Sequence, residues 1–481
     1  MSLPVYNSQQ IKLIEQQIFA SGVLSADLME QAGQAAFEVL QQCWPQAKKI
    51  IVLSGTGNNG GDGYVLARLA QQAGYMVELY YSGQPKTADA QLMQTKAQQH
   101  QVNMALWQGQ ILQADLIVDA LFGIGLNAAV TGTAQDMINA ANASQIEILA
   151  IDIPSGVNAD TGYVEGEAIN AQKTVCFIGY KLGLLTGDGA SYAGKIILKD
   201  LAIQLENYTL PKIQIWQKED LSFKKRAKNS HKGDFGHVLV IGGDEGMGGA
   251  VMMTAEACLR AGAGKVTVAT HPNHVAPLLS RCPEVMVQGI HHPEQLKPLI
   301  ENATVIVIGM GLGRQAWGQR LWLAVRDSEL PMVVDADALY WLAQQPQHKT
   351  NWVLTPHSGE AGRLLAKPYQ QINQQRLASV ESLVANYGGI ALLKGAGSLV
   401  ANQQQINLCP YGNAGMATAG MGDTLAGIMA GLVAQFGLSL ETVTKAVLAH
   451  ALAGDVAAQA GERGLLATDL LNPLKVLLNK Q

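Results

Sequence analysis

A glycine-rich segment that ends in an aspartate offers the clearest chemistry in this 481-residue chain. It spans residues 412–422, is followed by Asp423, and leads straight into the apolar segment 424–437. Glycines let backbone N–H groups crowd around phosphate oxygens, and the following helix points its positive end at them. Asp423 lies beside this anion site and can take a proton from a hydroxyl. The segment therefore predicts phosphorylation of an alcohol.

A second glycine-rich turn, at residues 55–63, follows a short apolar run and opens a helical pattern. Its first six residues match Gly-x-Gly-x-x-Gly, and Glu78 lies at the end of the next apolar run, where a ribose-binding acid would lie. These features are typical of a dinucleotide site and allow an NAD-dependent dehydrogenase. The structural alternative is a tight turn without a ligand, although so many glycines weaken folding unless something approaches the backbone.

Two aspartates end further apolar runs of the N-terminal half. We expect Asp119 and Asp152 at one sheet edge, where open α/β sheets bind ligands. Together with Asn59 and Ser155, Asp119 offers oxygen donors to a hard monovalent or divalent cation, whereas Asp152 is free to act as acid or base. For either aspartate alone, a helix cap or a loop hydrogen bond is an equal alternative.

The C-terminal half repeats the pattern of polar loops after apolar runs. Residues 394–398 combine small residues with one cation and would suit phosphates approached by backbone amides. Residues 309–314 and 355–360 should lie at the same sheet edge and wall the acceptor. Residues 242–250 form another glycine-rich junction, which suits close contact with a bulky ligand.

Several other polar residues carry weaker signals. Lys181 and Asp188 are interpreted as solvated loop charges. His357 is either a ligand-binding residue or a hydrogen-bonding filler of its loop. Residues 262–266 look similar to a phosphate-binding P-loop, but they lack its hydroxyl and precede a strand, so no P-loop is expected.

These loops require two sheets to bring them together. Short apolar runs recur at residues 50–53, 116–119, 148–152, 238–243, 265–268, 305–309, 333–335, 352–355 and 390–393. Parallel strands buried on both faces, with crossover helices between them, explain this pattern. Residues 1–42 should form one or two leading helices. The pattern lapses between Leu205 and Lys232, where we expect a boundary between two different α/β domains.

Composition excludes several classes of function. Hydrophobic residues make up 48% of the chain, which is ample for two cores. The net charge is −5, and the only dense basic cluster, at residues 224–228, is short, so nucleic-acid binding is not expected. Five scattered cysteines indicate a reducing cytoplasm, without a disulfide framework or zinc cluster. No leader or membrane-spanning run is expected, so we predict a soluble protein.

Three motifs of the N-terminal half occur in order, at residues 58–63, 119–125 and 152–156. Over about residues 1–210 they closely resemble the NAD(P)H-hydrate epimerase family. The resemblance implies that Asp152 lies against the substrate, where proton transfer by Asp152 is our hypothesis. It also implies a potassium ion held by Asn59, Asp119 and Ser155. The implied contacts to the hydrated dinucleotide are Asn58, Asn59, Gly60, Gly61, Asp62, Gly123, Ile124, Gly125, Leu126, Asn127, Ala128 and Ala129.

The Gly-x-Gly-Asp end of the opening segment resembles the ribokinase-like superfamily of small-molecule kinases. A finer set of motifs, at residues 231–236, 311–313, 335–339, 355–360, 394–398 and 415–423, resembles the nucleotide-dependent NAD(P)H-hydrate dehydratases over about 222–481. Members more often carry proline where this chain has Met310, Ser358 and Ala414, which are loop substitutions that leave the binding groups in place. The resemblance implies Ala250, Gly313, His357 and Asp423 at the hydrated dinucleotide. At the adenine nucleotide, used with magnesium, it implies Lys394, Gly395, Ala396, Gly397, Ser398 and Gly422.

The two halves together predict a bifunctional metabolite-repair enzyme. A Rossmann-like epimerase domain over 1–212 would interconvert the R and S hydrates of NADH and NADPH (NADHX and NADPHX). A ribokinase-like dehydratase domain over 222–481 would dehydrate the S form at the expense of ADP or ATP. Both domains would be three-layer α/β/α, in a cytoplasmic homo-oligomer without nucleic-acid or membrane partners.

Two rival interpretations remain open at this point. The first is an NAD-dependent dehydrogenase fused to a small-alcohol kinase. Residues 61–63, Gly-Asp-Gly, weigh against it, because a dehydrogenase would present apolar helix residues there. The second is a non-catalytic dinucleotide-binding module whose C-terminal half alone is active, and the presence of Asp119, Asp152 and Ser155 weighs against it.

Overall fold

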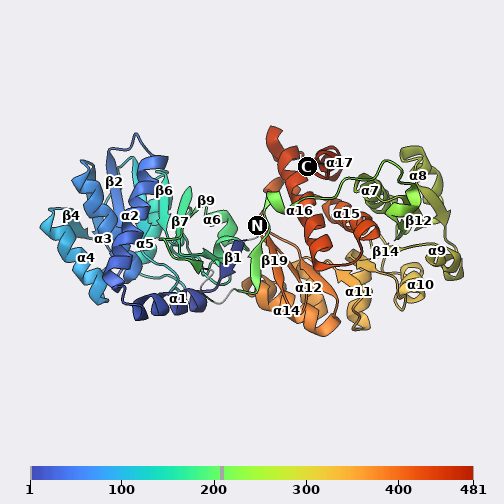
Figure 1. Cartoon of the computed structure of the whole chain (residues 1–481), viewed down its shortest axis with the longest axis horizontal. Helices are drawn as coiled ribbons and strands as arrows, with labels where there is room; N and C mark the ends of the chain where they lie inside the picture. Colours follow the sequence, from blue (N-terminus) through green and yellow to red (C-terminus); the bar gives the residue numbers. More distant parts are fainter. Residues whose placement is uncertain (1–2, 206–207, 209–210, 480–481) are drawn as a thin grey trace. The chain divides into compact units, whose positions relative to one another are not determined.

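The computed structural model describes residues 3–205, 208 and 211–479 and divides into two compact units (Figure 1). The N-terminal unit is Pro4–Pro211, and the C-terminal unit is built around Lys212–Gln481. The division falls within the region 205–232, where the sequence pattern lapses. Residues 206, 207, 209 and 210 of that region lie outside the described residues. Each unit is a three-layer α/β domain, as the sequence predicts.

The sheet of the N-terminal unit is parallel, with strand order β4-β3-β2-β5-β6-β7-β9. Its strands are β2 (Lys49–Ser54), β3 (Met76–Tyr81), β4 (Asn103–Leu106), β5 (Leu116–Ala120), β6 (Ile148–Ile151), β7 (Lys173–Phe177) and β9 (Lys195–Lys199). The chain winds outward from β2 through β3 and β4 and then continues on the other side at β5. This is the order of doubly wound dinucleotide-binding sheets, in which ligands bind where the winding direction reverses. Here the reversal lies between β2 and β5.

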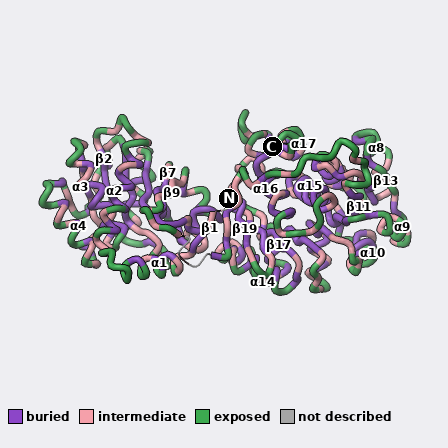
Figure 2. The backbone as a smooth tube through the Cα atoms, viewed as in Figure 1, coloured by how far each residue is buried: buried purple, intermediate pink, exposed green. Residues whose placement is uncertain are grey.

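Helices cover both faces of this sheet. One face packs against α2 (Ser25–Cys43), α3 (Asn58–Gln72) and α4 (Ala88–Gln99), and the other packs against α5 (Thr133–Ala143). Strand β2 shows how the sequence achieves this. Ile50 and Val52 join the first core and Ile51 and Leu53 join the second, and all four residues are fully buried. In each unit the buried backbone lies in the interior and the exposed backbone around it (Figure 2). Burial on both faces explains the continuous apolar run.

The two leading helices predicted for residues 1–42 are present as α1 (Ser8–Ala20) and α2, but a short strand that was not predicted from the sequence precedes them. Strand β1 (Leu3–Tyr6) pairs in parallel with β8 (Tyr180–Lys181), which brings Tyr6 opposite Lys181. Helix α1 follows, and its side chains at helical spacing, Ile11, Ile14 and Ile18, enter the core beside α2. A four-residue strand carries too little periodicity to be recognised in a sequence. The short elements η1 (Leu182–Leu184) and α6 (Gly189–Tyr192) complete the unit's described helices.

The C-terminal unit contains a parallel sheet of the order β13-β12-β11-β14-β15-β16-β17, extended by the antiparallel strands β18 and β19 and by β10, which is parallel to β19. The strands are β10 (Ile213–Ile215), β11 (His237–Ile241), β12 (Lys265–Thr270), β13 (Met286–Gly289), β14 (Val305–Ile308), β15 (Met332–Val334), β16 (Trp352–Leu354), β17 (Ile390–Leu393), β18 (Ser398–Ala401) and β19 (Ile406–Cys409). The winding reverses between β11 and β14. Ligand-binding loops are therefore expected at the carboxyl ends of these strands.

Four helices pack with one face of this sheet around a single core: α7 (Gly248–Arg260), α15 (Met421–Phe436), α16 (Leu440–Ala457) and α17 (Leu471–Leu477). The other α-helices of the unit are α8 (Val275–Arg281), α9 (Lys297–Glu301), α10 (Ala316–Val325), α11 (Ala336–Gln344), α12 (Ser358–Leu365), α13 (Tyr369–Gln374) and α14 (Arg376–Tyr387). The apolar segment after Asp423 is α15, which is buried along most of its length. Across the described part of the chain, no helix is both long and apolar enough to cross a membrane.

Two candidate active sites

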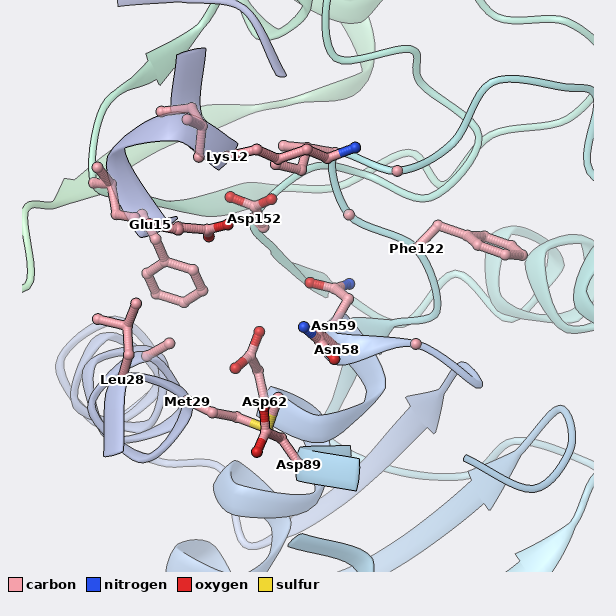
Figure 3. A pocket seen from close by; sticks show the side chains of 18 of the residues that line it. Lys12, Glu15, Leu28, Met29, Asn58, Asn59, Asp62, Asp89, Phe122 and Asp152 are labelled. Carbon is pink, nitrogen blue, oxygen red and sulfur yellow. The ribbon is translucent and has the colours of Figure 1, made fainter. Parts of the chain in front are cut away.

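The N-terminal unit contains a cavity of about 520 Å³ at the reversal point of its sheet. The start of α3 and the loop after β5, residues 121–126, form part of its wall (Figure 3). The backbones after β2 and β5 approach so closely that a Cβ atom at Gly55 would lie 1.8 Å from the carbonyl oxygen of Leu121. Only glycine permits this approach. The glycine-rich turn thus allows the cavity to form where sheets of this order bind ligands.

Most of the predicted substrate contacts line this cavity: Asn58, Asn59, Asp62, Gly123, Ile124, Gly125, Leu126 and Asp152. Asn127, Ala128 and Ala129 follow in the same loop but are not among the residues that line it. Gly60 and Gly61 are buried in the first turn of α3. A Cβ atom at Gly60 would lie 2.1 Å from the carbonyl oxygen of Gly55, so close packing accounts for Gly60 without a ligand.

Asp152 forms an ion pair with Lys181 inside the unit. The Nζ atom of Lys181 lies 2.5 Å from Oδ1 of Asp152 and donates to the carbonyl oxygen of Phe177 at 2.7 Å. The side chain of Lys181 is only 1% exposed, so its interpretation as a solvated loop charge is wrong. Burial opposes the ammonium and is the largest single cause, but Asp152 and Cys176 together raise the pKa of Lys181. Asp188, by contrast, is exposed as expected.

Asp119 is fully buried in a hydrogen-bond network with Ser155. Its carboxylate accepts from the backbone N–H of Ser155 at 2.8 Å, from the Ser155 hydroxyl at 2.6 Å and from the N–H of Leu121 at 3.1 Å. The Ser155 hydroxyl oxygen accepts in turn from the N–H of Phe122 at 2.9 Å. Burial raises the pKa of Asp119 to about 6, against the opposing hydrogen bonds from Ser155. The network ties the loop after β5 to the loop after β6.

Asn59 is the group in this region with unsatisfied hydrogen bonds. Its side chain is 8% exposed, and neither amide atom has a hydrogen-bond partner among the described residues. An added Cβ atom at Gly123 would lie 3.3 Å from Asn59 Oδ1 and 3.2 Å from Asp152 Oδ2, so both oxygens face the same loop. A buried amide without partners is costly unless a ligand or ion completes it. The position of Asn59 therefore indicates an occupant of the cavity.

The oxygen donors of Asn59, Asp119 and Ser155 fit a hard cation such as potassium. They are an amide, a carboxylate and a hydroxyl oxygen, which hard cations prefer. The orphaned Asn59 Oδ1 is the observation that supports this fit. Within the described residues, no three or more His, Cys, Asp and Glu side chains gather as a metal site would require. A cation here would therefore rely on amide and hydroxyl oxygens as well as on Asp119.

Glu78 does not lie where a ribose-binding acid is required. It lies within β3, before the strand's last residue, Tyr81. Its carboxylate pairs with Lys49 Nζ at 2.9 Å and accepts from the Tyr80 hydroxyl at 3.0 Å, and the hydrogen bond from Lys49 lowers its pKa. The feature that favoured a dehydrogenase is thus explained by surface pairing.

In the C-terminal unit, the start of α15 meets the loop after β17. Gly420 precedes the helix with φ 88°, a left-handed conformation that favours glycine, and its N-terminal turn has no side-chain cap. A Cβ atom at Gly422 would lie 3.6 Å from both Lys394 Nζ and Asp335 Oδ2. Lys394 Nζ itself lies 2.8 Å from Asp335 Oδ1. The free helix N–H groups and one partly buried ammonium therefore face the same space, as an anion site requires.

Asp423 lies in the first turn of α15 and is partly buried. Burial, followed by the charge of Asp335, raises its pKa to about 6, and Lys394 opposes the rise. The Thr254 hydroxyl lies 3.1 Å from the carbonyl oxygen of Asp423 and 2.9 Å from that of Ala250. It thus joins two of the predicted substrate residues. A carboxylate with this pKa is mostly ionised at neutral pH and can accept a proton.

The remaining predicted acceptor residues come from the carboxyl ends of β14 and β16. At the reversal point, a Cβ atom added to Gly311 would lie 3.3 Å from the Cβ of Ala250. A Cβ atom added to Gly313 would lie 2.5 Å from Asp244 Oδ2. His357 caps α12, because its Nδ1 accepts from the N–H of Gly359 at 2.9 Å. Its side chain is nevertheless 59% exposed. His357 therefore forms the hydrogen bond expected of a structural loop residue, and its ring also remains accessible to a ligand.

Arg376 is a residue that sequence reasoning missed. Its buried guanidinium donates to the carbonyl oxygens of Leu393, Lys394 and Gly397 at 3.2, 3.3 and 3.4 Å. Burial lowers its pKa to about 10. Arg376 thus anchors the predicted nucleotide loop, residues 394–398, through backbone carbonyl groups. No motif surrounds Arg376, because its function depends on a contact between α14 and a later loop.

A second cavity, of about 550 Å³, is lined by the basic cluster of residues 224–226 together with Arg260 and Lys475. These cations lie where α7, α15 and α17 end. Arg226 donates to the carbonyl oxygen of Gly262 and to Gln435 Oε1, beyond the last turn of α7 and within that of α15. Cations at helix C-termini neutralise the negative end of the helix dipole. The cluster is thus accounted for by the fold.

The fold and the two sites define a class of protein. A doubly wound domain with a dinucleotide-type cavity is fused to a second α/β domain that presents a helix N-terminus and a base, as small-molecule kinases do. A family model described as NAD(P)H-hydrate dehydratase matches residues 238–475, and one described as YjeF-related protein N-terminus matches residues 25–183. A bifunctional NAD(P)H-hydrate repair enzyme from Coxiella burnetii is 44% identical, over 99% of both chains. The chain therefore belongs to the family of bifunctional NAD(P)H-hydrate repair enzymes.

Solved structures support the assignment of the C-terminal fold. A ribokinase-like superfamily protein from Enterococcus faecalis matches with a TM-score of 0.53 and 35% identity, over 56% of this chain and 97% of its own. An ADP/ATP-dependent NAD(P)H-hydrate dehydratase from Bacillus subtilis, co-crystallised with ATP and Mg²⁺, matches with a TM-score of 0.50 and 26% identity, over 55% of this chain and 96% of its own. The C-terminal unit is accordingly ribokinase-like, as the sequence predicts.

Proposed function

We propose that this enzyme returns the hydrates of NADH and NADPH to the intact cofactors by two activities. The N-terminal unit interconverts the R and S hydrates, and the C-terminal unit dehydrates the S hydrate at the expense of ADP or ATP. The observation that carries the proposal is the convergence of Asp423, Lys394 and the uncapped start of α15 in a chain that also holds the Asp152 cavity. Family membership supports both assignments.

The dehydratase reaction follows from the chemistry of the hydrate. Hydroxide is a poor leaving group, whereas phosphate is a good one. Asp423 takes the proton from the hydroxyl, whose oxygen then attacks the terminal phosphorus of the nucleotide, and AMP or ADP departs. The N–H groups at the start of α15 and the ammonium of Lys394 stabilise the charge on the transferred group. Magnesium bound with the nucleotide would supply further neutralisation of its phosphates.

The second half of this reaction needs no strong acid. The electron pair of the ring nitrogen expels phosphate from the neighbouring carbon and leaves an iminium group. Loss of a proton from the adjacent carbon then restores the dihydronicotinamide. Ala250, Gly313 and His357 are proposed to hold the ring in this position, with residues 394–398 and Gly422 at the nucleotide.

In the epimerase unit, we place the hydrated ring against Asp152, with residues 58–62 and 123–129 around the dinucleotide. Potassium would be held by Asn59, Asp119 and Ser155. It would supply positive charge beside the dinucleotide and would fix the loop after β5. Asp152 is the proposed proton acceptor. The enzyme is proposed to act in the cytoplasm, because its cysteines are free. It is also proposed to be a homo-oligomer, because the proteins it resembles assemble.

A single assay tests the proposed function. The purified full chain receives mixed R and S hydrates with Mg²⁺ and either ADP or ATP, and the return of the reduced-nicotinamide absorbance is followed. Complete recovery of both epimers is the expected result. Recovery of the S hydrate alone would mean an inactive epimerase unit. No recovery, with phosphorylation of a simple alcohol instead, would favour the kinase alternative.

We expect Arg376→Met to weaken nucleotide binding. The change removes the guanidinium that donates to three backbone carbonyl groups, and losing the partner of a buried hydrogen bond costs about 1–3 kcal/mol. The KM for ADP or ATP should rise at least about tenfold, which corresponds to about 1.4 kcal/mol. The KM of Arg376→Lys should lie between that of the wild type and that of Arg376→Met. The exposed Arg363 on α12 provides the matched control, and Arg363→Met should leave KM unchanged. An unchanged KM in Arg376→Met would remove this residue from the nucleotide site.

Epimer exchange should depend on potassium. In buffers without nucleotide, replacing K⁺ by tetramethylammonium at equal ionic strength should slow the exchange several-fold, because this cation is too large for the oxygen donors. The exchange rate, measured by chromatography of the two epimers, checks the effect. Equal rates in both salts would argue against a cation at Asn59.

A further inference from the structure

Four carboxyl groups and two ammonium groups line the epimerase cavity. They belong to Glu15, Asp62, Asp89 and Asp152, and to Lys12 and Lys181. If all were ionised, this group would carry two uncompensated negative charges. Burial, followed by the charge of Asp152, raises the pKa of Glu15 and raises that of Asp62 well above its usual value. Burial and the charge of Asp152 therefore favour the protonated form of these two carboxyl groups.

The base and the proton carriers can be told apart by their contacts. Asp152 is paired with Lys181, whose ammonium is also anchored to the carbonyl oxygen of Phe177. The Asp62 side chain makes no hydrogen bond or ion pair with another described residue. It extends from α3 into the cavity, with Asp152 and Glu15 across from it (Figure 3). Asp152 is thus held in an ion pair with Lys181, whereas Asp62 is free to meet a ligand.

An independent observation shows that this space is built for a ligand. Asn59 lies one turn before Asp62 in the same helix, and its buried amide has no partner among the described residues. Its Oδ1 faces the loop at Gly123, as does Oδ2 of Asp152. Asn59, Asp62 and Asp152 line the same cavity, so a ligand held there can meet all three.

The chemistry of the hydrate defines what such a pair of groups can do. The dihydronicotinamide ring is an enamine, so it is protonated at the carbon two bonds from the nitrogen, and water adds to the carbon bonded to the nitrogen. The product is a hemiaminal. Its configuration can be inverted by opening the ring, which needs a base at the hydroxyl and an acid at the nitrogen. The alternative, loss of the hydroxyl as water, would form the same iminium group that yields NADH without phosphorylation.

We propose that Asp62 is the general acid that works with Asp152 to open and reclose the hemiaminal ring. Asp152 takes the hydroxyl proton, the C–O bond becomes a carbonyl, and the C–N bond breaks with its electron pair moving to the ring nitrogen. Asp62 donates its proton to that nitrogen. Rotation about the adjacent C–C bond turns the other face of the aldehyde to the nitrogen, and the reverse steps close the ring with inverted configuration. Atoms and charge balance without a co-reactant.

Lys181 positions Asp152 for this reaction, and Glu15 is not the acid that protonates the ring nitrogen. Lys181 fixes the Asp152 carboxylate and balances its charge. Glu15 comes from α1, on the Asp152 side of the cavity, where burial and the charge of Asp152 raise its pKa against the opposing charges of Lys181 and Lys12 (Figure 3). The charged groups around Asp62 are therefore Lys12, Glu15, Asp89, Asp152 and Lys181. This inference rests on the proposed epimerase function of the N-terminal unit.

The test compares Asp62→Asn with Asp62→Glu in the full chain. Epimer exchange is measured without nucleotide, with an enzyme-free blank for spontaneous exchange. Asp62→Asn should lose about 10²- to 10⁴-fold in exchange rate, the usual contribution of a general acid. Asp62→Glu, which keeps a proton-carrying carboxyl group, should restore part of it, and Glu15→Gln should change the rate far less. Repair of the S hydrate with ADP or ATP should be unchanged in all variants.

Each outcome decides one point. A normal exchange rate in Asp62→Asn, with exchange present in the wild type, would overturn the acid assignment and leave the proposed function standing. An absence of exchange in the wild type would instead remove the proposed function. Equal loss in Asp62→Asn and Asp62→Glu, with loss of hydrate binding to the N-terminal unit, would assign Asp62 to structure alone. In ¹⁸O-labelled water, ring opening should invert the carbon while most of the product keeps its original hydroxyl oxygen. Incorporation of one solvent oxygen at each inversion would overturn the ring-opening mechanism.

Discussion

Asp423→Asn should abolish repair of both hydrates while leaving the protein folded and able to bind its ligands. The carboxylate lies at the start of α15, beside the anion site formed with Lys394, and no other carboxylate is proposed to contact the ring. Asparagine has nearly the same shape but cannot accept the hydroxyl proton. Removal of a general base costs about 10²- to 10⁴-fold in rate. The measurement is the return of reduced-nicotinamide absorbance from pure S hydrate with saturating nucleotide.

The control and the pH profile make this result specific. Asp327→Asn replaces an aspartate that is 73% exposed and should repair at the wild-type rate. Burial raises the pKa of Asp423 to about 6, and the base must be ionised, so wild-type kcat should fall about tenfold per pH unit below pH 6. Near-normal turnover by Asp423→Asn would remove this residue from the role of base. Weak nucleotide binding by the variant would point to a structural defect instead.

Asp152→Asn should stop enzymatic exchange of the epimers and confine repair to the S hydrate. The expected loss in exchange rate is again about 10²- to 10⁴-fold, because the proton acceptor is gone. The same change leaves the ammonium of Lys181 buried without its counter-charge, which typically costs about 3–5 kcal/mol of stability. Exchange is followed by chromatography without nucleotide, and unfolding of the N-terminal unit is followed by denaturant titration.

A double variant separates catalysis from stability. Asp152→Asn combined with Lys181→Met removes both charges, and replacing a buried pair by less polar groups is often neutral or stabilising. Stability should return while exchange stays lost. Asp136→Asn, on the exposed surface of α5, serves as the control for the same chemical change. Exchange at the wild-type rate in Asp152→Asn would exclude Asp152 from proton transfer.

The sequence predicted the sheets and the loops that matter because both signals are local. The apolar runs at residues 50–53 and 390–393 lie in β2 and β17, and the glycine-rich turns follow the strands as expected. Parallel strands collect the loops at their carboxyl ends, so motifs far apart in sequence could be placed together. This is why Lys394 and the start of α15 were both expected at a phosphate site.

What the sequence did not reveal depends on long-range pairing. Lys181 looks like any loop lysine until β8 pairs with β1, which lies at the opposite end of the unit's sequence. Glu15 gave no signal, because the carboxyl group it faces is far along the chain. Arg376 likewise acts through carbonyl oxygens, which no side-chain pattern records. Glu78 was wrongly predicted as a ribose-binding acid because its distance in sequence from the glycine-rich turn was right. Its partner, Lys49, is part of no motif.

The pairing of β1 with β8 also bears on how fragments of this protein should be designed. The N-terminal family model begins at residue 25 and ends at residue 183, so it retains Lys181 but omits β1 and α1. A gene cut at those limits would encode an epimerase half without Glu15, without Tyr6 beside Lys181, and with the side chains that cover α2 stripped away. Such a fragment would lack one wall of its cavity. An inactive fragment would therefore report on the cloning boundary rather than on the enzyme.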